Sequence, residues 1–258
     1  MCLILFSWQQ NPSHPLILIA NRDEFYQRAT EELHHWESPA GIAAGRDLKA
    51  GGTWLAAHPS GRFAALTNVR SQHQHTAKAP SRGELIPGFL TSKLTLHQWC
   101  KQLQQRGHQY SGFNLLFGDI RNSQLFCYNN QTRRLIELKP GLYGLSNAEL
   151  DDDWPKVTRG KQLLENVLSQ PIVPNLDALW PILSDDQQPL VNQLPDTGIG
   201  LTAEQLLAPI TIRSEQYGTC SSMIMISQGT HAVAIHEQQR RPDLDEKIIS
   251  ITLTLRKD

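Results

Sequence analysis

Residues 3–8 read LILFSW and residues 16–20 read LILIA, and these two apolar stretches decide the fold prediction. The turn-forming sequence NPSHP at residues 11–15 separates them, so we predict a β-hairpin with strands Leu3–Trp8 and Leu16–Ala20. The polar sequence NRDE at residues 21–24 ends the second strand. Because the strands of a hairpin run antiparallel, this polar end returns beside the start of the first strand. We therefore expect Arg22 and Asp23 close to Cys2.

Further hairpins and helices follow along the chain. A second hairpin is predicted at Thr53–His58 and Arg62–Asn68, because Pro59-Ser60-Gly61 supplies the turn. Apolar residues at helical spacing predict a helix over Thr95–Gln105, with Thr95 as its N-cap. The other expected strands are Phe113–Phe117, Gln124–Tyr128, Arg134–Leu138, Leu142–Leu145, Ser221–Ser227, His231–His236 and Ile248–Leu255, and the other expected helices are Trp154–Leu168, Leu176–Leu183 and Thr202–Leu207.

This order of strands and helices predicts an α+β protein with two mainly antiparallel sheets between helical layers. The elements do not alternate strictly between strand and helix, which disfavours a doubly wound parallel sheet. We expect a single domain over residues 1–258, with the segment Asp185–Thr197 as its longest exposed loop.

Composition limits the classes of function. Basic residues number 24 and acidic residues 25, so no net field favours nucleic acid or an anionic membrane surface. The four cysteines show no C-x-x-C pair, which fits a reducing compartment. The chain shows no signal-peptide pattern and no apolar stretch long enough to span a bilayer. We expect a cytoplasmic protein without an integral membrane segment or a nucleic-acid partner.

Cys2 is the candidate nucleophile. Removal of Met1 would leave a free α-amino group on Cys2, which titrates near pH 8 and can take the thiol proton. Asp23 could orient that amine and Arg22 could lower the pKa of the thiol. Asn68 and Asn147 end strands and are candidate oxyanion donors. Each candidate also has a simpler interpretation. Cys2 could be a small residue packed at the start of a strand, and the segment with Arg22 and Asp23 could be a solvated turn with a salt bridge. Asn68 and Asn147 could be ordinary turn residues.

Several separated motifs together resemble one family. They are Asn21-Arg22-Asp23-Glu24, Ala44-Gly45-Arg46-Asp47, Gly51-Gly52-Thr53-Trp54-Leu55, Gly61 to Asn68, Leu145-Ser146-Asn147 and Tyr217-Gly218-Thr219. This set is similar to the NRDE family, also called the transport and Golgi organisation protein 2 family, over nearly the whole chain. The family is grouped with the N-terminal-nucleophile (Ntn) hydrolases, so the resemblance implies a four-layer αββα sandwich.

Within that superfamily the surroundings of Cys2 look most similar to those in choloylglycine hydrolases and penicillin V acylases. The resemblance implies that Cys2 is the nucleophile, that Asp23 contacts its amine, and that Asn68 and Asn147 supply backbone and side-chain oxyanion donors. Two arginines of the pattern are missing, because Ala20 and Cys220 occupy their positions. Arg213 is a candidate replacement for the second of them.

Two functions remain open from the sequence. The first is hydrolysis of a linear amide or acyl-amine bond through a Cys2 thioester, which requires no cofactor. The second, implied by the family resemblance, is a non-enzymatic intracellular haem carrier or chaperone that uses the same pocket. His34-His35, His73 and His75, which we expect in exposed loops, and Cys2 are candidate iron ligands, although a C-x-x-C-H attachment site is absent. A zinc site is weaker still, because His73-x-His75 and the cysteines lack the usual spacing. The expected partner is therefore a small-molecule substrate or haem.

Overall fold

The first hairpin lies in the middle of a six-stranded antiparallel sheet. The computed structural model describes residues 2–70, 79–170 and 175–256. The strands of this sheet, in spatial order, are β10 (Gly141–Leu145), β1 (Cys2–Trp8), β2 (Leu16–Phe25), β11 (Tyr217–Gln228), β12 (Ala232–Gln239) and β13 (Ile248–Thr254). β1 pairs with both β2 and β10, so the hairpin predicted at the start of the chain is confirmed and has neighbours on both sides.

A second antiparallel sheet of seven strands packs against the first. Its spatial order follows the sequence: β3 (Thr30–His35), β4 (Ala43–Asp47), β5 (Leu55–Ala57), β6 (Arg62–Asn68), β7 (Phe113–Asp119), β8 (Gln124–Asn129) and β9 (Arg134–Glu137). The predicted hairpin around Pro59-Ser60-Gly61 forms β5 and β6, with Gly61 in the left-handed region at φ 94°.

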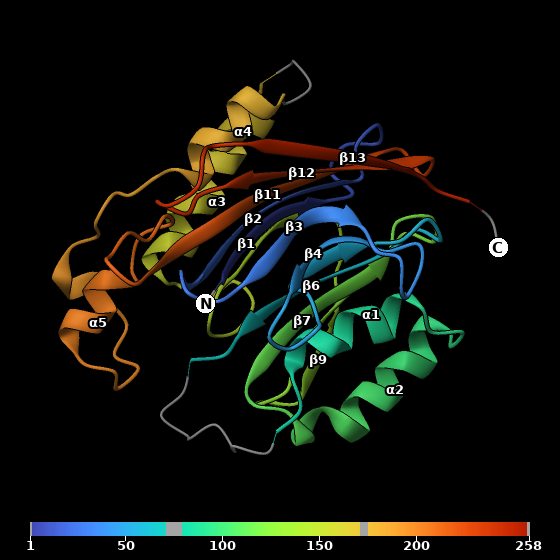
Figure 1. The fold of residues 1–258 in the computed structure, drawn as a ribbon, viewed down its shortest axis with the longest axis horizontal. Coiled ribbons are helices and arrows are strands. Elements are labelled where there is room, and N and C mark those ends of the chain that lie inside the picture. Colours follow the sequence, from blue (N-terminus) through green and yellow to red (C-terminus); the bar gives the residue numbers. More distant parts are fainter. Residues whose placement is uncertain (1, 71–78, 171–174, 257–258) are drawn as a thin grey trace.

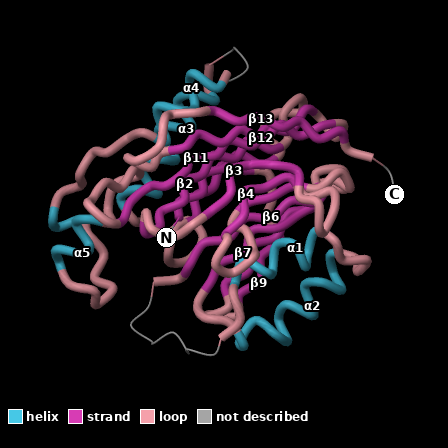
Figure 2. Tube along the Cα trace, viewed as in Figure 1, coloured by secondary structure: helices cyan, strands magenta, loops and turns pink. Residues whose placement is uncertain are grey.

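Helices cover the outer faces of both sheets. α1 (Leu85–Leu90) and α2 (Leu96–Arg106) lie on the seven-stranded sheet, and α3 (Pro155–Leu168) and α4 (Leu176–Leu183) lie on the six-stranded sheet (Figure 1). The tube in Figure 2 shows the two sheets stacked between these helical layers. The predicted four-layer order is therefore confirmed. A further short helix, α5 (Leu201–Leu206), lies beyond the layers.

Strand alternation assigns the apolar side chains to these layers. In β1, Leu3 and Leu5 pack with α3 and α4, whereas Ile4 and Phe6 pack in the core between the sheets. Both faces of the sheet are buried, which is why the strand is apolar at nearly every position. None of the helices in the described residues is long and apolar enough to cross a membrane.

The structure also differs from the predicted elements in particular places. β3, β4 and α1 were not predicted, and β2 continues to Phe25, so the NRDE sequence lies in the strand instead of a turn after it. The predicted helix after Thr95 is confirmed as α2, and the Thr95 side chain accepts from the Gln98 backbone in a capping box. The segment Asp185–Thr197 is a loop apart from a short 3₁₀ helix, Val191–Gln193.

Candidate active site

A small cavity of about 120 Å³ lies beside Cys2, where strand ends of the two sheets meet. Four of the predicted site residues line this cavity. They are Cys2, Arg22 and Asp23 from the first sheet and Asn68 from the second. The other lining residues are Glu24, Arg28, Asp47, Gly52, Thr53, Trp54, Leu66, Ser81, Arg82 and Gly83. Asn147, the fifth predicted residue, does not line the cavity and instead contacts Asn68.

Cys2 and Arg22 form a cross-strand pair on the face that is turned toward the second sheet. The Arg22 guanidinium lies 4.4 Å from the centre of the Trp54 ring and 3.7 Å from the Asp47 carboxylate. Burial raises the pKa of the Cys2 thiol, while the Arg22 charge and the Asp23 backbone amide act against that shift. The positive charge of Arg22 lies opposite Cys2 and therefore favours the thiolate form of this cysteine.

Asp23 lies on the opposite face of β2 and is only 1% exposed. Its carboxylate accepts a hydrogen bond of 2.7 Å from the Thr219 hydroxyl, and its backbone carbonyl accepts one of 3.1 Å from the Tyr217 hydroxyl. Burial raises the pKa of Asp23, and the nearby Lys156 ammonium acts against that shift. Because Cys2 pairs with Arg22, Asp23 stands next to the position of the Cys2 α-amino group.

Lys156 is a functional candidate that the sequence analysis missed. It lies in the first turn of α3, is 3% exposed, and donates a hydrogen bond of 3.0 Å to the Leu207 carbonyl. Burial lowers the pKa of Lys156 to about 8, although Asp23 and Cys2 favour its charged form. Its spacing with buried Gly160 and Leu164 on one helix face is a signal that could have revealed its burial.

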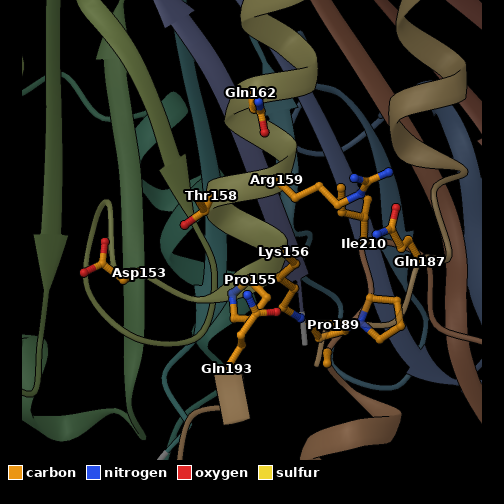
Figure 3. A pocket seen from close by; sticks show the side chains of 12 residues that line it. Asp153, Pro155, Lys156, Thr158, Arg159, Gln162, Gln187, Pro189, Gln193 and Ile210 are labelled. Atoms are coloured by element: carbon orange, nitrogen blue, oxygen red, sulfur yellow. The ribbon is translucent and has the colours of Figure 1, made fainter. Parts of the chain in front are cut away.

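A larger cavity of about 430 Å³ also has Lys156 in its wall. Figure 3 shows it between the first turns of α3, which carry Lys156 and Arg159, and the segment that carries Gln187 and Pro189. Arg159 is held there by a two-pronged ion pair with Asp185. Cys2 does not line this cavity and Lys156 does not line the Cys2 cavity, so the two cavities are separate.

The two asparagines lie in contact at the ends of β6 and β10. The Asn147 side-chain amide donates 2.8 Å to the Asn68 carbonyl, and the hydroxyl of Ser146 donates 3.1 Å to the Cys2 carbonyl. In β6, the backbone N–H of Leu66 donates to the Trp54 carbonyl. Because every second backbone N–H of a strand points to the same side, the backbone N–H of Asn68 also points toward the β5 side, beyond the start of β5 at Leu55. Asn68 lines the cavity, so its backbone N–H is a candidate hydrogen-bond donor there.

Besides Arg22, two cations that the sequence did not predict line the Cys2 cavity, Arg28 and Arg82. Arg213 is 73% exposed at its side chain, lies 4.0 Å from Asp186 and does not line the cavity, so the structure does not place it there as a replacement. Cys220 falls at the register shift between Thr219 and Ser221, and its sulfur lies 3.4 Å from the Glu24 carbonyl. Arg82 instead reaches the cavity from the segment that follows residues 71–78.

The histidine predictions have mixed outcomes. The loop prediction for His34-His35 is wrong, because both residues lie in β3; as part of an edge strand, the residues can be polar and still extended. His34 lies 3.5 Å from Glu31 and stacks on Trp36. His73, His75 and Met1 lie outside the described residues. Within the part of the chain that is described, no cluster of three or more His, Cys, Asp or Glu residues could hold a metal ion.

Haem as a ligand stays a prediction. The cavity at Cys2, about 120 Å³, is far below the roughly 300–1,000 Å³ of pockets that hold drug-sized ligands. Its lining combines guanidinium and carboxylate groups around one thiol, whereas a macrocycle needs broad apolar walls. The residues that line this cavity, as it stands, do not fit haem.

Comparisons with known proteins agree with these observations. A family model described as Transport and Golgi organisation 2 matches residues 1–242. The human homolog of transport and Golgi organization protein 2 is 37% identical over 260 residues, which covers 92% of each chain. The Mus musculus homolog is 35% identical over 256 residues, again with 92% of each chain covered. The Drosophila melanogaster protein is 27% identical over 257 residues, an alignment that covers 88% of this chain and 87% of the Drosophila protein.

Two solved structures share the fold at low sequence identity. A conjugated bile acid hydrolase mutant from Clostridium perfringens superposes with a TM-score of 0.55 at 8% identity, covering 97% of this chain and 92% of the other. A Caenorhabditis elegans ortholog of N-acylethanolamine-hydrolyzing acid amidase gives a TM-score of 0.52 at 11% identity, covering 88% and 92%. At these identities the likeness establishes an Ntn-hydrolase-like fold and nothing further.

Proposed function

The chain belongs to the Transport and Golgi organisation 2 family, and for this member we propose hydrolysis of a linear amide or acyl-amine bond through a thioester on Cys2. One observation carries the proposal: Cys2, Arg22 and Asn68 converge on a single small cavity, with Asp23 beside the amine position of Cys2. The likeness to an amidase ortholog and to a bile acid hydrolase supports it. That hydrolase is a mutant in which the cysteine at its own position two is alanine.

The first half of the reaction forms the thioester. The α-amino group of Cys2 takes the thiol proton, and the thiolate attacks the substrate carbonyl carbon. The carbonyl oxygen becomes an oxyanion, which accepts a hydrogen bond from the backbone N–H of Asn68. The ammonium then gives its proton to the leaving nitrogen, the carbon–nitrogen bond breaks, and an amine departs.

The second half releases the acid. The same amine takes a proton from water, the hydroxide attacks the thioester carbonyl, and the carbon–sulfur bond breaks. The thiolate leaves and takes back a proton from the α-ammonium group, which restores the Cys2 thiol. Over both halves, one amide and one water give one amine and one acid. No cofactor enters this balance, and Asp23 holds the amine in place through both halves.

The mechanism requires that Met1 be removed, because an acylated nitrogen on Cys2 cannot accept a proton. Position two carries a small residue, which is the condition under which cells generally remove the initiator methionine.

A panel of simple acyl amides tests the proposed function. Protein purified from its native host should release amine from at least one member, and Cys2→Ala should abolish that release. Cys220→Ala is the matched control, because Cys220 is a buried thiol outside the lining of the cavity. Release that survives Cys2→Ala, or no release from any member, would overturn the proposal.

A further inference from the structure

Three guanidinium groups, including Arg82, and three carboxylates, including Asp23, line the Cys2 cavity, and they are unevenly paired. Arg22 and Arg28 both contact Asp47, and Arg28 also lies 3.8 Å from Glu24. These two guanidinium groups thus share two carboxylates that line the same cavity. Their charges are balanced within the protein before any ligand arrives.

Arg82 differs from both. One of its nitrogens donates a hydrogen bond of 2.9 Å to the Gly112 carbonyl, which is neutral. Among the described residues no carboxylate lies within 4.0 Å of its guanidinium, and residues 71–78, which precede it, contain no Asp or Glu. An arginine keeps its proton at any pH a protein experiences, so this cation is permanent. It lines the cavity together with Cys2.

Arg82 is also coupled to the nucleophile. Burial lowers the pKa of Arg82, and Cys2 and Glu24 act in the opposite direction. A partly buried cation without a carboxylate partner favours the entry of an anion, because an opposite charge offsets its lost hydration.

The volume of the cavity limits that anion. About 120 Å³ corresponds to roughly four water molecules at about 30 Å³ each. Trp54 and Leu66 supply apolar wall beside the charges. A compact group fits this space.

Resting on the proposed function, we propose that the substrate of this site carries a compact anionic group, such as a carboxylate, close to its scissile carbonyl, and that Arg82 binds it. Arg82 is then the residue that decides between charged and neutral substrates. The carboxylate can lie on the amine side or on the acyl side of the scissile bond, and both have the same chemistry at Arg82.

Two alkylating reagents of nearly equal size test this inference without a known substrate. Iodoacetate is anionic and iodoacetamide is neutral, and both alkylate the thiolate of Cys2. The ratio of their rate constants at one pH cancels the thiolate fraction, so it reports recognition of the reagent's charge alone. Peptide mass spectrometry gives the extent of alkylation at Cys2.

In the folded protein the iodoacetate-to-iodoacetamide ratio should exceed that of the urea-unfolded chain by at least about tenfold, which corresponds to about 1.4 kcal/mol. Arg82→Gln should remove most of this preference, and Arg82→Lys should keep part of it. Arg46→Gln is the matched control, because Arg46 stacks on Trp36 at 4.5 Å and does not line the cavity. It should leave the ratio unchanged.

Protection experiments on the unmutated protein cover the case in which Arg82→Gln does not fold. Acetate should slow alkylation of Cys2 by iodoacetamide at lower concentration than acetamide does. N-acetylglycine and succinamic acid then distinguish a carboxylate on the amine side from one on the acyl side. Equal protection by acetate and acetamide, or a ratio that Arg82→Gln leaves intact, overturns the inference. An intact charge preference without release of amine from any amide would overturn only the proposed hydrolysis.

Discussion

The two faces of β2 near Cys2 use their polar side chains differently. On the face toward the helices, Asn21 and Asp23 are each 1% exposed and are held by hydrogen bonds to neighbouring segments. On the face toward the second sheet, Arg22 and Glu24 border the cavity that contains Cys2. Strand alternation thus turns two side chains of one four-residue motif toward the helices and two toward the second sheet, and Asp23 also lines the cavity.

Asp23 is the residue that can break this division, because its side chain lies on the supporting face while its carboxylate stands beside the Cys2 amine position. In the proposed mechanism, Asp23→Asn removes the charge that orients the amine. We expect acylation of Cys2 by p-nitrophenyl acetate to slow by about a thousandfold, near the middle of the range for general acid–base groups. Release of p-nitrophenol, corrected for Cys2→Ala, measures this rate. A rate close to that of the unmutated protein would leave Asp23 a purely structural residue.

Asn21 should act through stability alone. Its side-chain amide donates 2.9 Å to the carbonyls of both Leu183 and Ile210, and its oxygen accepts 2.7 Å from the Ser222 hydroxyl. Asn21→Ala leaves these buried groups without their partner, so the free energy of unfolding should fall by about 3 kcal/mol. Urea denaturation measures this loss. In native buffer the rate of Cys2 alkylation should not change. A large change would show that Asn21 affects the reactivity of Cys2 as well as stability.

Glu237 is a buried carboxylate that links the two sheets. It accepts a hydrogen bond from the Leu33 backbone amide and so connects β12 to β3 of the other sheet. Burial raises its pKa from 4.5 to about 7, with Glu32 adding to the shift and Arg22 opposing it. The folded chain therefore binds this proton more tightly than the unfolded chain. The resulting stability is fully present below pH 4.5 and is lost as the pH rises through 7.

Glu237→Gln removes this titration. Relative to the variant, the unmutated protein should lose about 3 kcal/mol of unfolding free energy between pH 4.5 and pH 7.5. Urea denaturation at the two pH values gives the difference. Parallel pH profiles for the two proteins would exclude a titrating Glu237 in the folded state.

Arg22 should give the smallest effect. Arg22→Gln removes a positive charge opposite Cys2, so the pKa of the thiol should rise by about one unit. The midpoint of the pH profile for alkylation by iodoacetamide measures this shift, with Arg46→Gln as the control. Because Arg28 remains on Asp47, the free energy of unfolding should change less than in Asn21→Ala. A midpoint that does not move would assign Arg22 to the supporting side.

Sequence reasoning predicted the first hairpin and the placing of Arg22 and Asp23 beside Cys2, because both follow from local pattern and antiparallel pairing. It missed α1, whose sequence LIPGFL contains Pro and Gly, since packing of Ile86 and Phe89 outweighs helix propensity there. It missed β3, which is an edge strand with the polar sequence TEELHH.

The missed site residues share one physical cause. Arg82 and Lys156 reach Cys2 and Asp23 only through contacts between elements that are distant in the sequence. Neither lies at a spacing that relates it to Cys2, and long cationic side chains are usually solvated. Periodicity indicates which face of an element is buried, but not which ionised group another element places against it.

Intact-mass spectrometry of protein from its native host, with and without iodoacetamide at neutral pH, tests the central claim most directly. The claim is that Cys2 begins the mature chain and is its reactive thiol. The predicted result is a mass that lacks Met1 and a single label, which peptide mapping places on Cys2 and not on buried Cys100, Cys127 or Cys220. A mass that retains Met1, or an unlabelled Cys2, would contradict the claim.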